Sequence, residues 1–554
     1  MADDSQNEES KIFGSFTRRL WTVFKNYANH GRLQISNVRS AFNDLDLFPS
    51  HSQIQEMVHC AVEYGSPCQA GHVTFGEFCV LVDELLHKYN APYLPPVPRA
   101  ILPSKTSGQG TVGRRKRKDS SLNFQVFLGG SCGSSKGPSR WRQQDAIPHL
   151  KENSITFYNP QVNAWRPELI ELEDRAKQVA DLLLFVIENS TRAVVSLCEI
   201  SYLVGCGRQI IVLFTDLEGE VACVDGESLC DREREDLNRG RRVLIDLIER
   251  NGIPVFCDMS KALSCSVLHL NQGVRVQDLT LKQGAQPVKH GHCLVGEALL
   301  KLRETFNSIT CDSQGKITKD DAGYVVRDLR LGYRCLSGQE LSAAWLQQQR
   351  PHTESFTFEE FCCIVAEYKQ RKPSALSSLC TALMSPFTWM FGKGRQRVSH
   401  VNEGGDGFDI YLGGSCGETS WRDEIALPLI KRQGLSYHNP HDTEWYSRLI
   451  PMQVAEREKC RLLLYVITSN SRSLAAMIEA AYYIGLGCRL VLCLQMLTPD
   501  SLIAGEKLSQ TALKDYNRGR AYLGDMASRE GVPQFQDIAE AVQCAISQVK
   551  DTTT

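Results

Sequence analysis

With 554 residues, of which 42% are apolar, the chain is long enough for about three to five domains with buried cores. Its 62 basic and 64 acidic residues leave a formal charge of −2, which excludes a chain-wide field for nucleic acid or an acidic membrane. None of the 21 cysteines shows the paired CxxC spacing of a zinc site, so we expect reduced core cysteines in an intracellular protein.

The N-terminal part of the sequence predicts a tail followed by a helical domain. Residues 1–14 are polar and acidic and lack the basic start and apolar core of a secretory signal. Residues 15–90 show helices around short loops, a layout that resembles an EF-hand. Calcium needs several oxygen ligands at fixed loop positions, and these loops offer few beyond Glu77. We therefore expect structural helical pairs, with calcium binding as the alternative, and no metal ion or other cofactor.

Residues 91–122 form a linker that contains prolines and one basic run. The run is Arg114, Arg115, Lys116, Arg117 and Lys118. Such a run is a nuclear import signal, a kinase site at Ser120 and Ser121, or simply a solvated segment. We expect a cytoplasmic protein, with nuclear entry as the alternative, and no direct binding of nucleic acid.

Residues 123–268 alternate short apolar runs with segments of helical period. The apolar runs are FQVFLGG, SITFYNP, DLLLFVI, RQIIVLF and IPVFCDM. Strands that alternate with helices imply a parallel sheet covered on both faces. We expect a doubly wound, flavodoxin-like α/β domain that binds its ligand beyond the carboxyl ends of the strands.

The same arrangement then occurs a second time. WRQQDAIPHLKENSITFYNP at 141–160 matches WRDEIALPLIKRQGLSYHNP at 421–440. We expect a second helical domain at 293–370 and a second α/β domain at 408–551, which makes the fold class α/β plus all-α. The loop acids of the second helical domain are Asp312, Asp321 and Glu360.

The linker between these two domains, residues 371–407, contains an uncharged run at 375–391. Its 17 residues are fewer than the roughly 20 apolar residues that span a bilayer, so we expect no transmembrane segment. We interpret the run as a linker packed on a neighbouring domain. A segment that binds a membrane surface or a partner is the alternative, because basic residues flank it.

Both α/β copies carry the same glycine turn after the first strand, followed by a Trp-Arg pair. Adjacent glycines let the backbone approach phosphate or sugar oxygens, although tight packing explains them equally well. The tryptophan either stacks on a nucleobase or attaches the first helix to the sheet. The residues are Gly129, Gly130, Ser131, Trp141 and Arg142 in the first copy and Gly413, Gly414, Ser415, Trp421 and Arg422 in the second.

A lone glutamate lies on an apolar helical segment in each copy. Glu199 is the only charged residue in AVVSLCEISYLVGCG, and Glu479 is the only one in SLAAMIEAAYYIGLG. A buried, unpaired carboxylate is costly or has a shifted pKa. We therefore expect either a nucleophile or base that faces a ligand, or an ion pair with an arginine of the same domain such as Arg142 or Arg239.

The motif NRGR is expected to begin the helix before the last strand in each copy. Arginine does not complement the dipole at a helix start, so these arginines would contact a phosphate or a carboxylate, the alternative being a pair with Asp236 or Glu235. An Asn-Pro step also follows the second strand of each copy. The predicted ligand-binding residues of these motifs are Asn159, Asn238, Arg239, Asn439, Asn517 and Arg518.

Together, the LGGS turn, the Asn-Pro step, the run DLLLFVI and the lone glutamate resemble the nucleoside 2-deoxyribosyltransferase superfamily, in its eukaryotic branch. The resemblance implies that each domain binds a nucleoside or nucleotide and that Glu199 and Glu479 attack the anomeric carbon of the sugar. It also implies that Asp181 handles the base in the first copy, where the second copy has Arg461. A further acid expected shortly before the nucleophile is replaced by Ala193 and Ser473.

These departures favour a ligand-sensing or scaffold protein with two diverged pockets. The alternative is an enzyme that cleaves or transfers at an N-glycosidic bond through Glu199, with Glu479 as the weaker candidate. We expect the helical domains to contact protein partners. Because the family completes its sites between subunits, the duplication predicts an internal pseudo-dimer of the two α/β domains.

Overall fold

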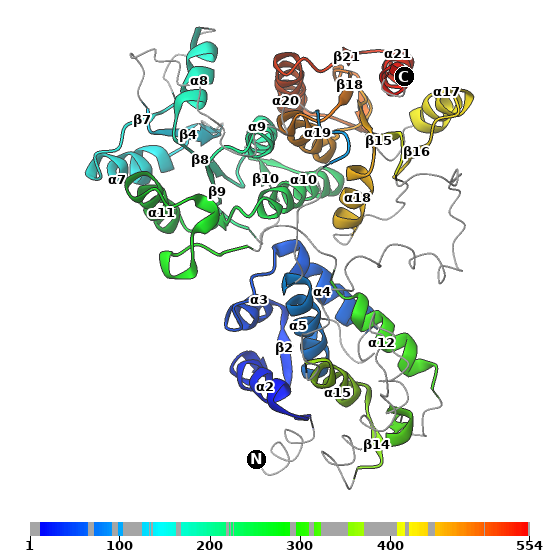
Figure 1. The fold of residues 1–554 in the computed structure, drawn as a ribbon. Helices are drawn as coiled ribbons and strands as arrows, with labels where there is room; N and C mark the ends of the chain where they lie inside the picture. Colours follow the sequence, from blue (N-terminus) through cyan, green and yellow to red (C-terminus); the bar gives the residue numbers. More distant parts are fainter. Residues whose placement is uncertain are drawn as a thin grey trace. The chain divides into compact units, whose positions relative to one another are not determined.

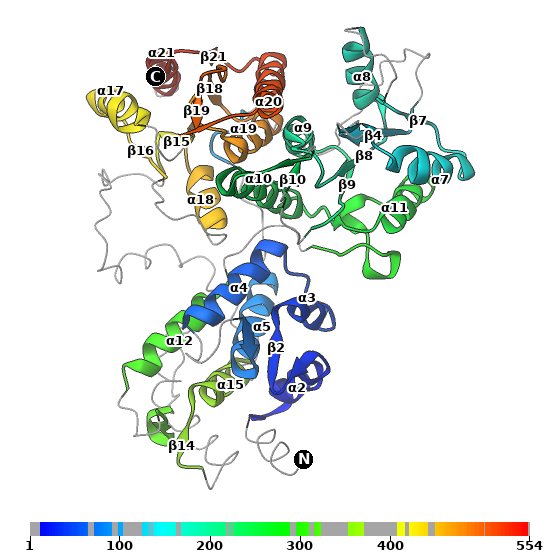
Figure 2. The ribbon, with the colours of Figure 1, turned by 180° about the vertical axis from the view of Figure 1, so that it is seen from behind.

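The computed structural model describes most of the chain outside its linkers. The described residues are 11–64, 71–90, 98–102, 124–131, 133–134, 137–161, 168–217, 221, 223–224, 226–288, 295–309, 315–322, 353–370, 407–415, 420–440, 449–503 and 505–551. The chain divides into two compact units. The helical unit combines Met1–Leu94 with His292–Ser399, and the α/β unit combines Pro95–Gly291 with His400–Thr554. Both are drawn in Figures 1 and 2.

The helical unit contains both helical segments of the sequence. Its first half is formed by α2 (Ser15–Tyr27), β1 (Ala28–Asn29), β2 (Arg32–Gln34), α3 (Ile35–Asn43), α4 (His51–Tyr64), β3 (His72–Thr74) and α5 (Phe75–Asn90). Its second half contains α12 (Glu297–Asn307), β13 (Ile317–Thr318), β14 (Ser355–Phe356) and α15 (Phe358–Gln370). A short antiparallel ladder joins two loops in each half, with Leu33 opposite Val73 and Ile317 opposite Phe356. The EF-hand-like character of these loops stays a prediction.

Three of the acids that we considered as loop ligands contact threonines at the start of the following helix. The Glu77 carboxylate accepts a hydrogen bond from the Thr74 backbone N–H at 2.8 Å, and the Glu360 carboxylate accepts one from that of Thr357 at 2.9 Å. Asp321 accepts the Thr318 hydroxyl at 2.6 Å. Among the described residues, no three His, Cys, Asp or Glu side chains are grouped so that they could hold a metal. Asp312 lies outside the described residues.

The two halves of the helical unit are connected by reciprocal helix caps. The buried Glu367 of α15 accepts the Thr17 backbone N–H at 2.7 Å, at the start of α2. Conversely, the buried Glu84 of α5 accepts the Gly296 backbone N–H at 2.8 Å, just before α12. Each carboxylate satisfies helix-terminal N–H groups that have no partner in their own helix. The two halves therefore share one core, which includes Phe78 and Phe361.

Removing one of these caps is expected to destabilise the helical unit. In Glu367→Ala the buried Thr17 amide and hydroxyl lose their acceptor, which should cost about 1–3 kcal/mol. Urea unfolding of the full chain, monitored by hydrogen exchange in α2, measures this loss. The control Glu63→Ala changes a half-exposed side chain that pairs with His59 one turn earlier, and should cost less than about 0.5 kcal/mol. Equal effects of the two changes would contradict the capping role.

The first α/β domain contains the five strands that its apolar runs predict. They are β4 (Val126–Gly130), β7 (Phe157–Tyr158), β8 (Leu182–Ile187), β9 (Ile210–Phe214) and β12 (Val255–Phe256), all parallel, in the order β7-β4-β8-β9-β12. Its helices are the π-helical turn η1 (Arg142–Ala146), α7 (Ile147–Glu152), α8 (Glu168–Val179), α9 (Val194–Gly205), α10 (Asp231–Arg250) and α11 (Met259–Gln272), followed by the short turns η2 (Val276–Asp278) and η3 (Leu281–Gln283). Two hairpins, β5 (Gly133–Ser134) with β6 (Gly137–Pro138) and β10 (Cys223–Val224) with β11 (Glu227–Ser228), extend from the loops.

The second α/β domain repeats this topology. Its parallel strands are β15 (Ile410–Gly414), β16 (Tyr437–His438), β17 (Leu462–Ile467), β18 (Leu490–Leu494) and β21 (Gln534–Phe535), in the order β16-β15-β17-β18-β21. Its helices are η6 (Arg422–Ala426), α17 (Leu427–Arg432), α18 (Leu449–Glu458), α19 (Leu474–Leu486), α20 (Gln510–Arg529) and α21 (Ile538–Asp551), and β19 (Leu502–Ile503) pairs with β20 (Glu506–Lys507). In both sheets the first strand lies between the second and the third, which confirms the flavodoxin-like prediction.

No described helix combines the length and the apolar character that crossing a membrane requires. The uncharged run at 375–391 and the basic run at 114–118 lie outside the described residues. Of the first linker, residues 98–102 are described, and they contact the second α/β domain. The Leu102 backbone N–H donates to the Gly487 carbonyl at 3.1 Å, and Ile101 forms an antiparallel bridge with Cys488.

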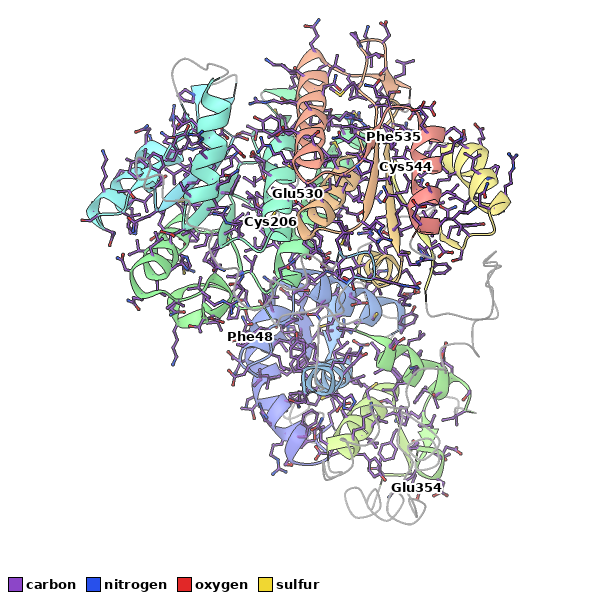
Figure 3. All side chains as sticks on the ribbon, turned by 45° about the horizontal axis from the view of Figure 1, so that its top comes forward. Phe48, Cys206, Glu354, Glu530, Phe535 and Cys544 are labelled. Carbon is purple, nitrogen blue, oxygen red and sulfur yellow. The ribbon has the colours of Figure 1, made fainter. Side chains whose placement is uncertain are left out.

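Helices α9 and α19 pack against each other and join the two α/β domains in one core. Their backbones approach closely, because a Cβ atom added to Gly205 would overlap the Tyr482 carbonyl oxygen and one added to Gly485 would overlap that of Tyr202. The Ser201 hydroxyl donates to the Ile478 carbonyl at 2.6 Å, and the Tyr202 hydroxyl donates to Glu530 at 2.7 Å. Figure 3 labels Glu530 and Cys206 at this end of the contact. Since each helix is covered by its own domain and by its counterpart, each is apolar on almost all sides.

Gly205→Ala should loosen this contact although the substitution is on only one of the two helices. Alanine favours a helix over glycine by about 1 kcal/mol, but overpacking against the Tyr482 carbonyl should cost about 1–3 kcal/mol. We expect faster hydrogen exchange in α19, measured by mass spectrometry on the full chain. As a control, Gly207→Ala places its Cβ in open space at a φ of +70°, so any strain should stay local to the end of α9. Unchanged exchange of α19 in Gly205→Ala would contradict the close contact.

Candidate functional site

The order of strands reverses at the same place in both sheets, between β4 and β8 and between β15 and β17. Ligands of doubly wound domains bind at such a point, beyond the carboxyl ends of the strands. The glycine turn lies there in each domain, since Gly130 ends β4 opposite Val186 and Gly414 ends β15 opposite Val466. The sequence therefore places its most conspicuous motif at the position where the fold favours a ligand.

Packing against the neighbouring strand requires the glycines of both turns. A Cβ at Gly129 would overlap the Phe185 ring, and one at Gly413 would lie 2.8 Å from the Tyr465 ring. Gly130 and Gly414 have φ values of +107° and +115°, which side-chain-bearing residues rarely adopt. The tight-packing explanation is thus sufficient for the glycines, and ligand contact is an additional proposal.

Arg142 and Arg422 bind the backbone carbonyl groups of the two glycine turns. The Arg142 guanidinium donates to the carbonyls of Leu128, Gly130 and Ser131 at 3.2, 2.9 and 2.8 Å. Arg422 donates to the carbonyls of Leu412, Gly414 and Ser415 at 3.2, 3.5 and 2.8 Å. Arg142 is fully buried, and its guanidinium binds the turn, so the expected alternative of an Arg142–Glu199 ion pair is wrong.

The tryptophans beside these arginines are buried as well. Trp141 and Trp421 are only 6% and 3% exposed, and each ring stacks on the guanidinium of the next residue, with 4.4 and 4.5 Å from ring centre to Cζ. The Trp421 indole N–H also donates to the Ser415 carbonyl at 3.1 Å. This geometry agrees with the alternative in which the tryptophans attach the first helix to the sheet.

In each domain a serine hydroxyl of the glycine turn forms a hydrogen bond with the loop after the third strand. Ser131 and Thr191 share a hydrogen bond of 2.8 Å between their hydroxyl oxygens, and Ser415 and Ser473 share one of 2.6 Å. Ser415 also accepts the Thr468 backbone N–H at 2.9 Å. The N-caps of α9 and α19, Ala193 and Ser473, are both left-handed. Turn and loop are therefore connected in both domains, and in the second domain the N-cap Ser473 takes part in that connection.

The second arginine of each NRGR motif, which we expected to contact a phosphate or a carboxylate, instead supports these loops. Arg241 donates to the Glu188 and Thr191 carbonyls at 3.3 and 3.4 Å and to the Asn189 side chain. Arg520 donates to the carbonyls of Thr468, Ser471 and Gln495 at 3.2, 2.6 and 3.0 Å. Burial lowers the pKa of each guanidinium to about 10. These arginines fix the loops on which any ligand at the switch point would rest.

The expectation that NRGR begins a helix is wrong. Helix α10 begins at Asp231 and α20 at Gln510, more than one turn earlier, because the Cys230 thiol and the Ser509 hydroxyl cap these helices. Within the helices, Asn238 accepts the Val221 backbone N–H at 3.2 Å. Asn517 accepts the Leu497 N–H and donates to the Leu497 carbonyl, both at 2.9 Å. The two asparagines thus hold the segment that follows the fourth strand.

The remaining NRGR arginines lie near carboxylates. Burial raises the pKa of Asp236, against the opposing charges of Arg472 and Arg239, so Arg239 lies in the electrostatic neighbourhood that our alternative named. The Arg518 guanidinium lies 5.7 Å from the Tyr522 ring centre, and its charge acts to lower the pKa of Glu199 in the other domain.

Glu199 and Glu479 each form an ion pair with a cation on the preceding helix. Lys177 Nζ of α8 lies 2.5 Å from Glu199 Oε1, and Arg457 Nη2 of α18 lies 2.9 Å from Glu479 Oε1. Burial raises the pKa of Glu199, while the charge of Lys177 opposes the rise. An ion pair therefore exists in both domains, but the partner is an arginine, as expected, only in the second; in the first it is a lysine.

The surroundings of the two pairs differ between the domains. Arg457 also donates to the Tyr411 hydroxyl at 3.0 Å, and the Tyr465 hydroxyl donates to Glu479 at 3.4 Å. The first domain has Phe127 and Phe185 at the corresponding positions of its strands. Lys177 lies 5.2 Å from the Phe127 ring centre. The Arg457–Glu479 pair thus has one additional hydroxyl contact at each partner, where the first domain has phenylalanine rings.

The structure does not bring Asp181 to the glycine turn. Asp181 precedes β8, at the amino-terminal edge of the sheet, where its backbone N–H donates to the Gln125 carbonyl at 3.0 Å. Its counterpart Arg461 pairs with Asp409 at 2.9 Å. The base-handling role of Asp181 stays untested, and its distance from the carboxyl edge of the sheet weighs against it.

The two Asn-Pro asparagines make different contacts. Asn159 Oδ1 accepts the Gln161 backbone N–H at 3.0 Å in a local turn. Asn439 Oδ1 is buried without a hydrogen-bond partner among the described residues. Of the two asparagines, Asn439 is therefore the one whose side-chain oxygen could still accept a hydrogen bond from a ligand.

Sequence reasoning missed one acid at the carboxyl edge of the first sheet. Glu188 directly follows β8, and burial raises its pKa while the charge of Arg142 opposes the rise. The second domain has Thr468 in this place. The signal was present in the run DLLLFVIE, because a charged residue directly after a buried parallel strand lies at the edge where ligands bind.

Replacing Lys177 tests the ion pair. In Lys177→Met the buried Glu199 loses its counter-ion, which should cost about 3–5 kcal/mol near neutral pH. The loss of a positive charge raises the pKa of Glu199 further in the folded state only. The variant should therefore regain stability as the pH falls below that pKa, so the loss should be smaller at pH 5 than at pH 8. Urea-unfolding midpoints at the two pH values measure the difference.

The control for this change is the double variant Lys177→Met with Glu199→Gln. Without the Glu199 carboxylate, only the more exposed Glu173, whose Oε1 lies 2.9 Å from Lys177 Nζ, loses a counter-ion, so most of the lost stability should return and its pH dependence should become small. A loss that is the same in both backgrounds would mean that Lys177 acts through packing rather than through its charge.

Comparison with known families agrees with the sequence resemblance. Residues 123–217 and 407–497 each match the family described as "Nucleoside 2-deoxyribosyltransferase like". The matched segments cover the first four strands of each sheet and both lone glutamates. Comparisons with curated proteins and with solved structures gave no match.

Proposed function

Because the chain contains two nucleoside 2-deoxyribosyltransferase-like domains in tandem, we propose that it binds a nucleoside or nucleotide and acts as a ligand-sensing or scaffold protein. The ligand would lie beyond the carboxyl ends of the strands, against the glycine turn and the loop after the third strand. The Ser131–Thr191 and Ser415–Ser473 hydrogen bonds hold these two segments together and preorganise such a surface.

The observation that carries this proposal is the pairing of both lone glutamates with buried cations. A carboxylate that attacks a sugar carbon must present an oxygen lone pair to that carbon. Here Oε1 of each glutamate faces Lys177 or Arg457 at 2.5 or 2.9 Å. Opening a buried pair costs about 3–5 kcal/mol, which would add to the barrier of a covalent step through Oε1. Binding without chemistry requires no such opening.

Ligand binding without catalysis has stronger support in the second domain than in the first. Arg457 is only 1% exposed at its side chain, and its planar guanidinium is shared between Glu479 and the Tyr411 hydroxyl. A guanidinium stays charged and rigid, so this arrangement resists rearrangement.

The alternative function is an enzyme that cleaves or transfers at an N-glycosidic bond in the first domain. Two observations favour it there and not in the second domain. Lysine holds Glu199 through a flexible chain rather than a fixed fork. In addition, Glu188 supplies a half-buried acid with a raised pKa at the carboxyl edge, where the leaving base would need a proton.

We also propose that the two α/β domains act as an internal pseudo-dimer. The contact between α9 and α19 and the influence of Arg518 on Glu199 support a site to which both domains contribute. Protein partners of the helical unit and a cytoplasmic or nuclear location stay predictions.

Binding and catalysis are separated by one set of experiments on the full chain. A panel of nucleosides and nucleotides is incubated with the wild type and with Glu199→Ala and Glu479→Ala. We expect at least one member to raise the melting temperature of the wild type without release of free base in chromatography. Base release by the wild type that Glu199→Ala abolishes and Glu479→Ala keeps would establish the enzyme instead. No stabilisation by any member would contradict both functions.

A further inference from the structure

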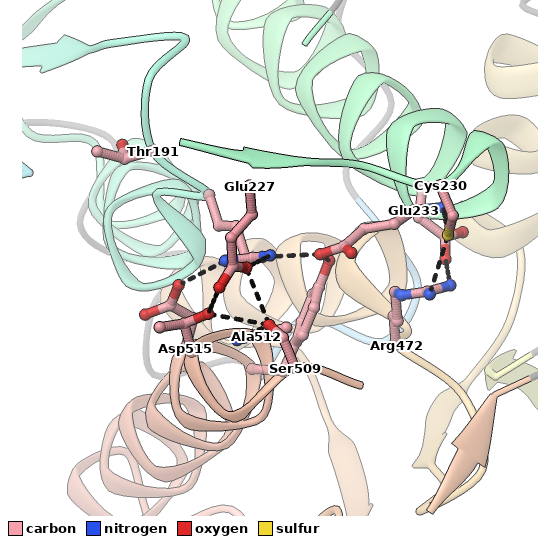
Figure 4. Close-up of polar contacts among 12 residues, drawn as sticks. Thr191, Glu227, Cys230, Glu233, Arg472, Ser509, Ala512 and Asp515 are labelled. Atoms are coloured by element: carbon pink, nitrogen blue, oxygen red, sulfur yellow. Dashed lines mark hydrogen bonds and ion pairs between the residues drawn. The ribbon is translucent and has the colours of Figure 1, made fainter. Parts of the chain in front are cut away.

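A cavity of about 300 Å³ lies between the two α/β domains, apart from both glycine turns. The domains line it with equivalent segments: the residues before the N-caps of α9 and α19, the hairpins β10–β11 and β19–β20, and the starts of α10 and α20. Its polar lining includes Arg192 and Glu233 from the first domain and Arg472, Lys507 and Ser509 from the second. Figure 4 shows the contacts around it.

In the first domain the cavity arginine has a complete set of partners. Arg192 is 2% exposed, and its Nε donates to Glu233 of α10 at 2.7 Å. Its terminal nitrogens reach Glu227 at 3.3 Å and Asp515 of the other domain at 3.4 Å. Glu233 also accepts the Tyr516 hydroxyl at 3.3 Å. Arg192 thus shows that an arginine in this position binds a carboxylate at its Nε.

In the second domain the equivalent arginine lacks that carboxylate. Arg472 is also 2% exposed, but the position of α20 that corresponds to Glu233 is occupied by Ala512. Among the residues that the structure describes, the buried Nε of Arg472 has no hydrogen-bond partner. Leaving a buried guanidinium N–H without an acceptor is unfavourable, so an incoming acceptor would stabilise the site.

The carboxylates that contact Arg472 lie at its terminal nitrogens and not at its Nε. Asp236 of the other domain lies at 3.3 Å and Glu506 at 3.7 Å, and both side chains are at least 40% exposed. Glu506 instead accepts the Cys230 thiol at 2.7 Å. Both carboxylates therefore lie at terminal nitrogens, as Glu227 and Asp515 do at Arg192, and neither supplies the acceptor that Nε lacks.

We propose that this cavity binds a small organic carboxylate, whose carboxylate group takes the place at Arg472 that Glu233 takes at Arg192. Lys507 and Ser509 line the same cavity and offer a second charge and a hydroxyl to the remainder of the ligand. The volume lies at the lower end of the range for small-molecule sites. Because Arg472 immediately precedes the N-cap Ser473 of α19, the bound carboxylate would also stabilise the loop that contacts the glycine turn of the second domain.

The proposal is tested with glutarate, whose end resembles a glutamate side chain, by calorimetric titration of the full chain. We expect saturable binding of one glutarate per chain. Ala512→Glu supplies the carboxylate from the protein itself and should weaken glutarate binding at least about tenfold, the effect of about 1.4 kcal/mol. Glu233→Ala should do the opposite, since it leaves Arg192 as Arg472 now is, and should raise the stoichiometry from one to two.

The two variants keep the test decisive if one of them fails to fold. Glutarate binding that is unchanged in Ala512→Glu, or a stoichiometry that stays at one in Glu233→Ala, would overturn the proposal, as would the absence of saturable binding to the wild type. Inorganic phosphate is titrated in parallel, and binding of phosphate alone would overturn the choice of a carboxylate. Nucleoside binding is not needed for any of these outcomes, so failure of the proposed function is a separate result.

Discussion

The close approach of α9 and α19 is the constraint on which the α/β unit depends. Gly205 and Gly485 let the two helices touch backbone to backbone, so each helix is enclosed by its own domain and by its counterpart. A glutamate on such a helix cannot reach water freely and needs a cation nearby. The preceding helix of each domain supplies it, as Lys177 or Arg457.

Within this shared frame the two copies have diverged in chemistry rather than in backbone. The first domain keeps an acid, Glu188, at the carboxyl edge of its sheet, whereas the second surrounds its glutamate with tyrosines. In the cavity between the domains the difference has the opposite sense, because Nε of Arg192 has a carboxylate partner, whereas Nε of Arg472 has no partner among the described residues. The positions that differ are Phe127 and Tyr411, Lys177 and Arg457, Phe185 and Tyr465, Glu188 and Thr468, and Glu233 and Ala512.

The strands, the repeat and the lone glutamates could be predicted from the sequence, because strand runs and apolar helices leave strong local patterns. The partner of Glu199 could not, since Lys177 lies 22 residues away on another helix and only the packing of α8 brings it near. The same holds for the reciprocal caps of Glu84 and Glu367, which bond across more than 200 residues. The start of α10 was misplaced because its cap, Cys230, is not a typical capping residue.

The most direct test of the central claim is a crystal structure of the full chain with the nucleoside or nucleotide that stabilises it most. The account predicts the ligand beside the glycine turns, with the Lys177–Glu199 and Arg457–Glu479 pairs intact and the glycosidic bond whole. A sugar bonded to Glu199, or a Lys177 displaced from that carboxylate by the ligand, would contradict it and would make the first domain an enzyme.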